Sequence, residues 1–266
     1  MAAERQQPGQ RFADRVALIT GGGGGLGGEY CRAFAREGAR VVAADLDEAG
    51  LDRLARSMAA EGSWCDPQRA DLTREDDIRA LFEHCAAAYG GIDILVNNAG
   101  GDLAHHGPIE TLPVRQWDDV LDRNLRTAFL CARAAAPQMK AKRCGKIVNV
   151  SSRAARSVGW YGAVTVAYIC AKLGVIGLTR HLAKELGPYG INVNCLVPAF
   201  TISGPLLQQH WDGMTDAERE TMLRATPLGR LPEMSDMANV VLFLASEESA
   251  YMTGVAVDVN GGSWMA

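Results

Sequence analysis

Tyr168 and Lys172 are the pair of side chains in this sequence best suited to acid–base chemistry. They lie four positions apart in a stretch with helical spacing, which puts both on one helix face, about 5–6 Å apart at Cβ. A free phenol titrates near ~10, but an ammonium about 4 Å away, at an effective dielectric near ~20, contributes about 4 kcal/mol. That would lower the phenol pKa by up to about three units, so we expect a tyrosine able to act as a base. The alternative is an exposed helix pair worth less than about 1 kcal/mol.

A glycine-rich loop follows the first β-branched segment. Thr20-Gly-Gly-Gly-Gly-Gly-Leu-Gly-Gly28 stands between that segment and an Arg/Ala-rich stretch with helical spacing. Glycine permits positive φ and close backbone approach, and a helix start offers unpaired N–H groups and the positive end of a dipole. This position favours a pyrophosphate-binding loop over a flexible turn. The predicted cofactor contacts here are Gly21, Gly25, Leu26 and Gly27.

Asp45 ends the second predicted strand, downstream of the glycine loop. A carboxylate there can accept both hydroxyls of an adenosine ribose and would repel a 2′-phosphate. No basic residue stands in the loop, and Ala44 precedes Asp45, so the sequence predicts NAD as cofactor in preference to NADP. Leu46 is predicted to contact the same nucleotide. The alternative for Asp45 is a helix N-cap, for which Asp47 is the better candidate.

Asp71 closes the third predicted strand and is followed by Leu72. Both are predicted to border the adenine of the cofactor. Capping of the next helix is an equally open interpretation of Asp71.

Elements of two kinds alternate from end to end and must position these residues. Strands are predicted at residues 16–20, 40–44, 92–96, 146–150, 191–196 and 255–259, with a weak seventh strand between Ser63 and Ala70 that Pro67 must bend or confine to an edge. Helices are predicted at residues 26–36, 48–60, 74–89, 117–142, 166–186 and 235–245. Such alternation builds an α/β fold, a single doubly wound Rossmann domain with a seven-stranded parallel sheet and helices on both faces.

One domain is expected over residues 1–266, because no repeat, linker or composition break divides the chain. Residues 1–11 are expected to be flexible. A helical insert at residues 205–226 follows the strand predicted at residues 191–196 and contains Trp211. We interpret it as a substrate lid, the alternative being an ordinary surface helix pair.

The composition excludes several classes of protein. With 48% apolar and 22% charged residues and a net charge of −4, the chain is typical of a soluble globular protein without a nucleic-acid or membrane partner. Seven cysteines without a CxxC pair suggest reduced thiols, and the polar N-terminus and short apolar runs favour a cytoplasmic protein. Asp102, His105 and His106 are not expected to bind a metal, since adjacent ring nitrogens on a loop rarely converge on one ion.

Six motifs follow one another at the ends of successive predicted elements. They are Thr20-Gly-x-x-x-Gly25-x-Gly27, Asn97-Asn98-Ala99-Gly100, Asn124 in Asp122-Arg-Asn-Leu, Ile147-Val-Asn-Val-Ser151-Ser152, Tyr168-x-x-x-Lys172 and Ile191-Asn-Val-Asn-Cys-Leu-Val-Pro198. With this set the chain resembles the short-chain dehydrogenase/reductase family, from about Phe12 to Gly262.

The resemblance implies a role for each matching residue. Tyr168 would be the general base on a substrate hydroxyl in oxidation, or the acid in reduction. Lys172 would lower the pKa of that tyrosine and hold the nicotinamide ribose. Ser152 would hydrogen-bond the substrate oxygen. Asn124 would hold a water that links Lys172 to solvent, and Asn97 would support the central sheet and border the adenosine side.

The family pattern also implies further cofactor contacts and an assembly. The remaining NAD contacts would be Asn98, Ala99, Gly100, Pro198, Ala199 and Thr201. A homotetramer is implied as well, and the small and apolar residues on several faces of the helix at 168–186 suit close packing against another chain.

Two departures from the family pattern concern the substrate side. The segment from Ser152 to Tyr168 is longer than usual and contains Trp160 and Tyr161, which leaves Ser157 as a second candidate for the serine role. Ala199 stands where the family has glycine. We expect Trp160, Tyr161 and Trp211 to form an apolar, aromatic substrate wall.

The sequence therefore predicts an NAD-dependent oxidoreductase that transfers a hydride between a small-molecule secondary alcohol and its ketone. Arg153 and Arg156 are expected to be solvated, so the predicted substrate is uncharged and bulky or cyclic. One alternative is a 3-oxoacyl-thioester (acyl carrier protein) reductase, which would require NADPH and is disfavoured by Asp45. Another is a non-catalytic nucleotide-sensing protein. It is disfavoured because the whole set is present together: Ser152, Tyr168, Lys172 and Asn124.

Overall fold

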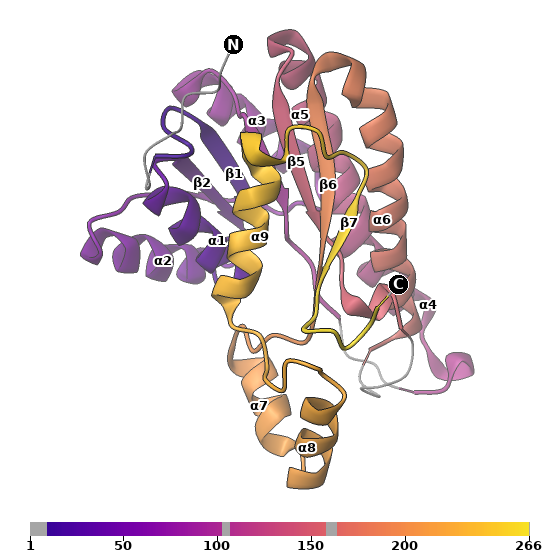
Figure 1. Ribbon diagram of the computed structural model, residues 1–266. Coiled ribbons are helices and arrows are strands. Elements are labelled where there is room, and N and C mark those ends of the chain that lie inside the picture. The colour runs from indigo at the N-terminus through magenta and orange to yellow at the C-terminus, as the bar shows by residue number, and fades with distance from the viewer. Residues whose placement is uncertain (1–9, 103–106, 158–163, 266) are drawn as a thin grey trace.

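The computed structural model describes residues 10–102, 107–157 and 164–265. Its strands are β1 (Val16–Thr20), β2 (Arg40–Asp45), β3 (Asp66–Arg69), β4 (Ile94–Asn97), β5 (Gly145–Val150), β6 (Ile191–Pro198) and β7 (Ala256–Val259). They form one sheet in the order β3-β2-β1-β4-β5-β6-β7, and every neighbouring pair is parallel (Figure 1). The predicted fold class and the seven-stranded sheet are confirmed.

Helices cover both faces of this sheet. They are α1 (Gly25–Arg36), α2 (Glu48–Ala60), α3 (Glu75–Tyr89), α4 (Val114–Leu121), α5 (Thr127–Lys142), α6 (Val166–Leu186), α7 (Pro205–Gly213), α8 (Asp216–Arg224) and α9 (Met234–Ala245). The core on one face is filled from α1, α2 and α9, and the core on the other from α3, α5 and α6. The central strands β1, β4 and β5 are buried along their whole length, as expected for parallel strands covered on both sides.

Pro67 lies in β3, which is only four residues long and is the edge strand next to β2. Proline has no N–H to donate to a ladder, and an edge strand tolerates that loss. The predicted confinement of this strand to an edge is confirmed.

The helix predicted at residues 117–142 differs most from the structure. It starts three residues earlier, at Val114, and a π-helical turn, η2 (Asp122–Arg126), separates α4 from α5. Such turns are rare and are frequently found at functional sites, and hydrophobic periodicity does not reveal them. Asn124, which is 1% exposed, lies in the middle of this turn.

By length and composition alone, the segment Val166–Tyr189, which comprises α6 and the 3-10 turn after it, is long and apolar enough to cross a membrane. The short apolar runs of the sequence predict no such segment. One face of α6 packs against β6, where Val175 and Ile176 contact Cys195 and Val197. This is the position of a core helix in a globular domain, so its length is weak evidence for a membrane span.

The insert at residues 205–226 is helical, as predicted, and consists of two short helices, while its role as a substrate lid stays a prediction. Figure 1 shows α7 and α8 extending from the end of the sheet at which β6 ends. Thr215 begins α8 with a reciprocal capping box to Glu218. The carboxyl ends of the strands and this helix pair frame the candidate site.

Candidate active site

The glycine loop forms a cradle at the start of α1. Gly21 and Gly25 have φ of +66° and +55°, in the left-handed region that favours glycine. A Cβ built on Gly27 would lie 1.9 Å from the carbonyl oxygen of Gly21, so only glycine fits there. No side chain in the described residues caps α1 after Gly24, so its first N–H groups are available to a phosphate. The loop fits the pyrophosphate of a dinucleotide.

Asp45 is held against this loop by two backbone groups. Its Oδ2 accepts from the N–H of Gly23 at 2.9 Å, and its Oδ1 accepts from the N–H of Asp47 at 3.0 Å. Because each carboxylate oxygen has two lone pairs, both oxygens keep one position for a ribose hydroxyl. Asp47 takes the N-cap position of α2, but its side chain makes no cap bond and pairs with Arg53. Leu46, beside Asp45, is 49% exposed.

Asp71 does not cap α3, whose N-cap residue is Arg74. Its Oδ1 instead accepts from both the backbone N–H and the hydroxyl of Thr73, at 3.0 and 2.7 Å. Burial acts to raise the pKa of Asp71, but the Thr73 bonds outweigh it and the pKa is lowered. The Leu72 side chain is 6% exposed and packs in the core with Phe82, so a nucleotide would contact Leu72 through its backbone, and this contact stays a prediction.

Thr20 joins the glycine loop to the Asn-Asn-Ala-Gly segment after β4. Its hydroxyl accepts from the N–H groups of Asn98 and Ala99, both at 3.0 Å. The Asn98 amide in turn donates to the carbonyls of Thr20 and Gly21. Asn98 therefore braces the cradle through its side chain. Sequence reasoning placed Thr20 in the motif but missed this bridging role.

Asn97 supports the central sheet, as predicted. Its Nδ2 donates to Asn149 Oδ1 at 2.9 Å and to the carbonyl of Ala128 at 3.3 Å. Asn149 continues the chain to the hydroxyl of Thr179 in α6 at 2.9 Å. These buried bonds tie β4 and β5 to α5 and α6.

Ser152, Tyr168 and Lys172 meet where β5 and α6 come together. Ser152 ends the strand segment, and its side chain lies close enough to the Tyr168 hydroxyl to lower the pKa of that tyrosine, which favours Ser152 over Ser157. Lys172 is 4% exposed, and its Nζ donates to the carbonyl of Val150 at 3.0 Å. Its Nζ lies 5.5 Å from the centroid of the Tyr168 ring. The structure thus brings together the three side chains that the sequence selected.

The expected lowering of the Tyr168 pKa by Lys172 is wrong for the chain without a bound cofactor. Burial of the hydroxyl raises the pKa of Tyr168 to about 12, the Ser152 side chain lowers it, and the charge of Asp102 raises it further. Burial also lowers the pKa of Lys172 from 10.5 to about 8. The ammonium lies over the ring and donates to a carbonyl, so burial outweighs its attraction for a phenolate.

Asn124 uses its side chain to hold the loop after β4. Its Nδ2 donates to the carbonyls of Gly101 and Val120, both at 2.9 Å, and its Oδ1 accepts from the N–H of Gly101 at 3.1 Å. Because both amide hydrogens are in use, a water bound here could only donate to an oxygen of Asn124. The water relay to Lys172 stays a prediction.

The end of β6 lies beside the glycine loop. Ala199, after Pro198, donates its N–H to the carbonyl of Val259 at 3.0 Å, and the buried Thr201 hydroxyl donates to the carbonyl of Ala199 at 3.1 Å. A Cβ on Gly25 would lie 2.8 Å from the Ser203 carbonyl oxygen. The base of the insert therefore borders the start of α1.

Neither arginine after Ser152 is solvated, contrary to expectation. Arg156 donates to Asp258 Oδ1 at 3.1 Å and to the carbonyl of Ala256 at 3.2 Å, and its guanidinium lies 5.0 Å from the Trp264 ring centroid. These contacts bind the loop to β7 and the C-terminal segment. Arg153 is 6% exposed. The prediction that these arginines are solvated rested on their position in a loop, and it failed because both side chains are largely buried and Arg156 is hydrogen-bonded.

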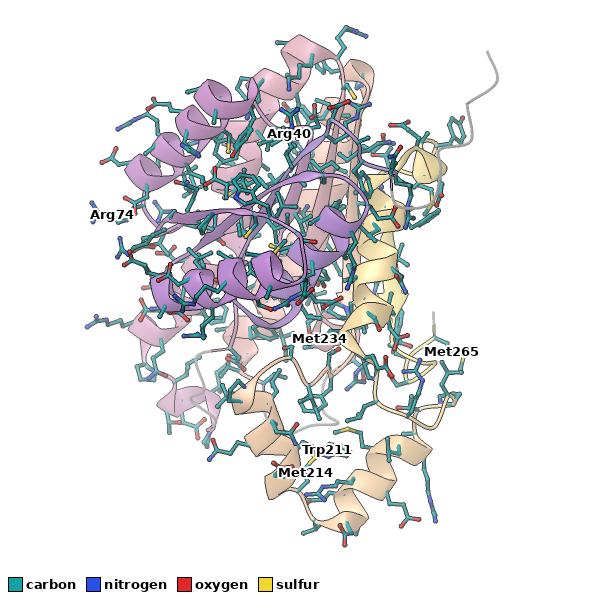
Figure 2. The ribbon with its side chains drawn as sticks, turned by 90° about the vertical axis from the view of Figure 1, so that its left-hand side faces the viewer. Arg40, Arg74, Trp211, Met214, Met234 and Met265 are labelled. Atoms are coloured by element: carbon teal, nitrogen blue, oxygen red, sulfur yellow. The ribbon has the colours of Figure 1, made fainter. Side chains whose placement is uncertain are left out.

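Of the predicted substrate wall, the described part is Trp211. Its ring stacks on that of Phe200, with 6.4 Å between the two ring centroids. The guanidinium carbon of Arg219 lies 5.5 Å from the Trp211 ring centroid, and this contact joins α7 to α8 (Figure 2). The predictions for Trp160, Tyr161, His105 and His106, and most of the prediction for residues 1–11, concern positions outside the described residues.

Comparisons with known proteins agree with this geometry. A family model described as enoyl-(acyl carrier protein) reductase matches residues 22–263. A 3-oxoacyl-(acyl-carrier-protein) reductase of Thermotoga maritima is 38% identical over 253 residues, covering 95% of this chain and 98% of that protein. A (2S)-((R)-hydroxy(phenyl)methyl)succinyl-CoA dehydrogenase subunit of Thauera aromatica is 38% identical over 250 residues, covering 94% and 96%. The solved structure of levodione reductase matches with a TM-score of 0.87 at 30% identity, covering 94% of this chain and 98% of that one.

Proposed function

Because the chain belongs to the short-chain dehydrogenase/reductase family, we propose that it is an NAD-dependent oxidoreductase acting on a secondary alcohol or its ketone. The observation that carries this proposal is the meeting of Ser152, Tyr168 and Lys172 at the carboxyl end of the sheet, beside a loop that fits a dinucleotide. Parallel α/β sheets bind their ligands at that edge.

Each residue has a task in the proposed reaction. In the oxidation direction Tyr168 accepts the proton of the substrate hydroxyl, and in reduction it returns that proton. Ser152 donates to the substrate oxygen as charge develops there. Lys172, held by Val150, keeps a positive charge beside the phenol ring. The nicotinamide, when bound, supplies the hydride chemistry and, in its oxidised form, a further positive charge.

That further charge matters because the Tyr168 pKa is raised to about 12 in the chain alone. A phenol with so high a pKa is almost wholly protonated near neutral pH, so it cannot accept the proton of a substrate hydroxyl. Oxidised cofactor and a protonated Lys172 both favour the phenolate. Proton transfer is therefore expected to depend on cofactor binding first.

NAD is proposed as the cofactor because of Asp45. Both its oxygens are fixed by backbone N–H groups and still have a lone pair for a ribose hydroxyl. Its charge would oppose a 2′-phosphate at the same place.

A neutral, bulky or cyclic substrate is proposed for the same site. Arg156 is bound to Asp258 and packed on Trp264, so it is not oriented toward an anionic substrate. Trp211 and Phe200 add an aromatic surface at the base of the insert. The similar levodione reductase is, by its name, an enzyme for a dione.

A 3-oxoacyl-thioester reductase is the second candidate, favoured by the relative in Thermotoga maritima. The Thauera aromatica relative is named for a substrate that contains both a secondary alcohol and a CoA thioester, so it shares a feature with each of the two candidates.

A reducing, cytoplasmic setting is part of the proposal, since all seven cysteines are free thiols.

Turnover measurements separate the candidates. Purified protein is incubated with NAD and a panel of neutral secondary alcohols, with NAD and matched carboxylated alcohols, and with NADPH and a 3-oxoacyl thioester. The proposal predicts the highest kcat/KM for NAD with a neutral alcohol. Faster turnover of the thioester with NADPH would favour the reductase, and a preference for carboxylated alcohols would contradict the neutral substrate.

A further inference from the structure

Asp102 makes two hydrogen bonds that join distant parts of the chain. It lies in the loop after β4, and Thr165 immediately precedes α6. Asp102 Oδ2 accepts from the backbone N–H of Thr165 at 2.8 Å, and Oδ1 accepts from the Thr165 hydroxyl at 2.7 Å. Hydrogen bonds to an ionised carboxylate are stronger than hydrogen bonds between neutral groups, so these two bonds hold Thr165 strongly to Asp102.

Thr165 passes this constraint to the first turn of α6. It is the N-cap residue of that helix, is 6% exposed, and its hydroxyl oxygen accepts from the N–H of Tyr168 at 3.2 Å. The same hydroxyl thus donates to Asp102 and accepts from Tyr168. Movement of Asp102 would move the cap and the backbone from which the Tyr168 side chain projects.

The other end of this chain of contacts is Asn124. Gly101, the residue before Asp102, is held through both its N–H and its carbonyl by the Asn124 amide. Gly100 has φ of +144°, and a Cβ there would lie 2.3 Å from Asn124 Oδ1, so the loop fits closely over the π-helical turn. The contacts run from Asn124 through Gly101, Asp102 and Thr165 to Tyr168.

We propose that Asp102 is a positioning residue for the reaction, which fixes the first turn of α6 through Thr165 and so determines where Tyr168 presents its hydroxyl. The inference rests on the proposed function, since it concerns the same tyrosine. The π-helical turn contributes to this positioning, because its residue Asn124 holds the loop that contains Asp102.

The charge of Asp102 has a second effect, on the Tyr168 hydroxyl. Among the described residues, the groups that face Tyr168 are Asp102 from the loop after β4, Ser152 from the end of β5 and Lys172 from α6 itself. From β6, Cys195 interacts with Lys172. Burial contributes most to the raised pKa of Tyr168, Ser152 lowers it, and Asp102 raises it. Loss of the Asp102 charge therefore lowers the pKa of Tyr168.

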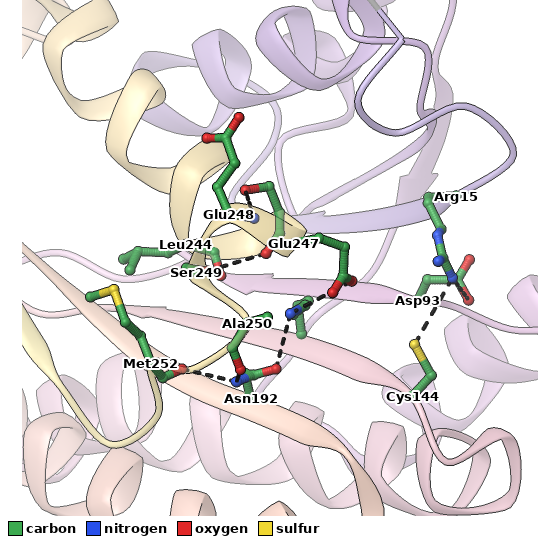
Figure 3. A network of polar contacts seen from close by, with 12 residues as sticks. Arg15, Asp93, Cys144, Asn192, Leu244, Glu247, Glu248, Ser249, Ala250 and Met252 are labelled. Atoms are coloured by element: carbon green, nitrogen blue, oxygen red, sulfur yellow. Dashed lines mark hydrogen bonds and ion pairs between the residues drawn. The ribbon is translucent and has the colours of Figure 1, made fainter. Parts of the chain in front are cut away.

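Two substitutions separate the positioning effect from the charge. Asp102→Ala removes both acceptors and the charge. Asp102→Asn removes the charge but keeps one carbonyl acceptor and adds an amide that can donate to the Thr165 hydroxyl. Asp93→Asn is the matched control: Asp93 also accepts a backbone N–H, from Val16 at 2.9 Å, but lies at the opposite end of the sheet with Arg15 (Figure 3).

The test measures kcat and KM against pH, the dissociation constant of NADH, and hydrogen exchange of the first turn of α6 in the protein without cofactor. For Asp102→Ala we expect kcat to fall roughly 10- to 100-fold, with KM and NADH binding changed less than about 3-fold, and exchange to accelerate. Asp102→Asn should retain more of the wild-type kcat than Asp102→Ala does. In the oxidation direction, the pH at which its kcat rises should shift to lower values. Asp93→Asn should leave profile and exchange unchanged.

The exchange arm decides the inference independently of activity. Unaltered exchange in both Asp102 variants would overturn it, whereas an unshifted pH profile in Asp102→Asn would refute only the second effect, that of the Asp102 charge on the Tyr168 hydroxyl. If the wild type turns over none of the substrates, the proposed function fails, while faster exchange in the variants still establishes the positioning contact. Should Asp102→Ala fail to fold, Asp102→Asn and Thr165→Val provide both readouts, and Thr165→Ser, which keeps the hydroxyl, should restore wild-type exchange.

Discussion

Replacing Asp45 by alanine is expected to weaken the preference for NAD over NADP. The wild-type carboxylate has one free acceptor position on each oxygen, and a hydrogen bond to a charged group contributes about 1.5–3 kcal/mol. Repulsion of a 2′-phosphate about 4 Å away would cost about 4 kcal/mol at an effective dielectric of ~20, which partial exposure of Asp45 reduces to about 1–2 kcal/mol. The NAD:NADP ratio of kcat/KM should therefore fall roughly 10²- to 10³-fold.

The ratio is the quantity to measure, because Asp45→Ala also removes the acceptor for Gly23 and weakens the loop for both cofactors. Initial rates are recorded with each cofactor at several concentrations and one saturating alcohol. Asp47→Ala is the matched control, since that carboxylate is exposed and pairs with Arg53 outside the glycine loop. An unchanged ratio in Asp45→Ala, or a wild type that uses NADP equally well, would refute the reasoning.

Two buried groups and the exposed surfaces of two helices give further expectations. Because burial lowers the pKa of Lys172 from 10.5 to about 8, the unfolded chain binds this proton more tightly, and the contribution of Lys172 to stability rises between about pH 8 and about pH 10.5. Lys172→Met should thus be more stable than the wild type at about pH 7, by up to about 3 kcal/mol, and lose that advantage at high pH; identical urea midpoints of the two proteins at both pH values would contradict this. Tyr30→Phe should leave the free energy of unfolding unchanged or raise it by about 1 kcal/mol, since the Tyr30 hydroxyl is buried without a partner among the described residues, and a clear loss of stability would show that the hydroxyl is bonded. Light scattering at micromolar concentration should give a homotetramer of the 28.5 kDa chain, consistent with exposed Leu173 and Phe129 on α6 and α5, and a monomeric mass would disprove it.

Much of the fold could be predicted because single elements carried clear patterns. The boundaries of β1, α2 and α6 match those expected from periodicity, and Pro67 correctly marked an edge strand. The π-helical turn around Asn124 could not be predicted, because a single turn of five residues is too short to show a periodicity of its own.

The candidate site was predictable in its residue types and not in its electrostatics. Sequence spacing brought Tyr168 and Lys172 together, but the depth of burial that raises one pKa and lowers the other is a tertiary property. Arg156 shows the same limit. Its partners Asp258 and Trp264 are about a hundred positions away in the sequence, so no local pattern indicates them.

The most direct test of the account compares the wild type with Tyr168→Phe. NADH formation from NAD and the best alcohol of the panel is followed by absorbance, and NADH binding by fluorescence titration. Because phenylalanine removes only the titratable oxygen, turnover should fall by at least ~10²–10⁴ while NADH affinity stays near that of the wild type. Turnover at the wild-type rate in Tyr168→Phe would contradict the assignment of Tyr168 as the acid–base residue.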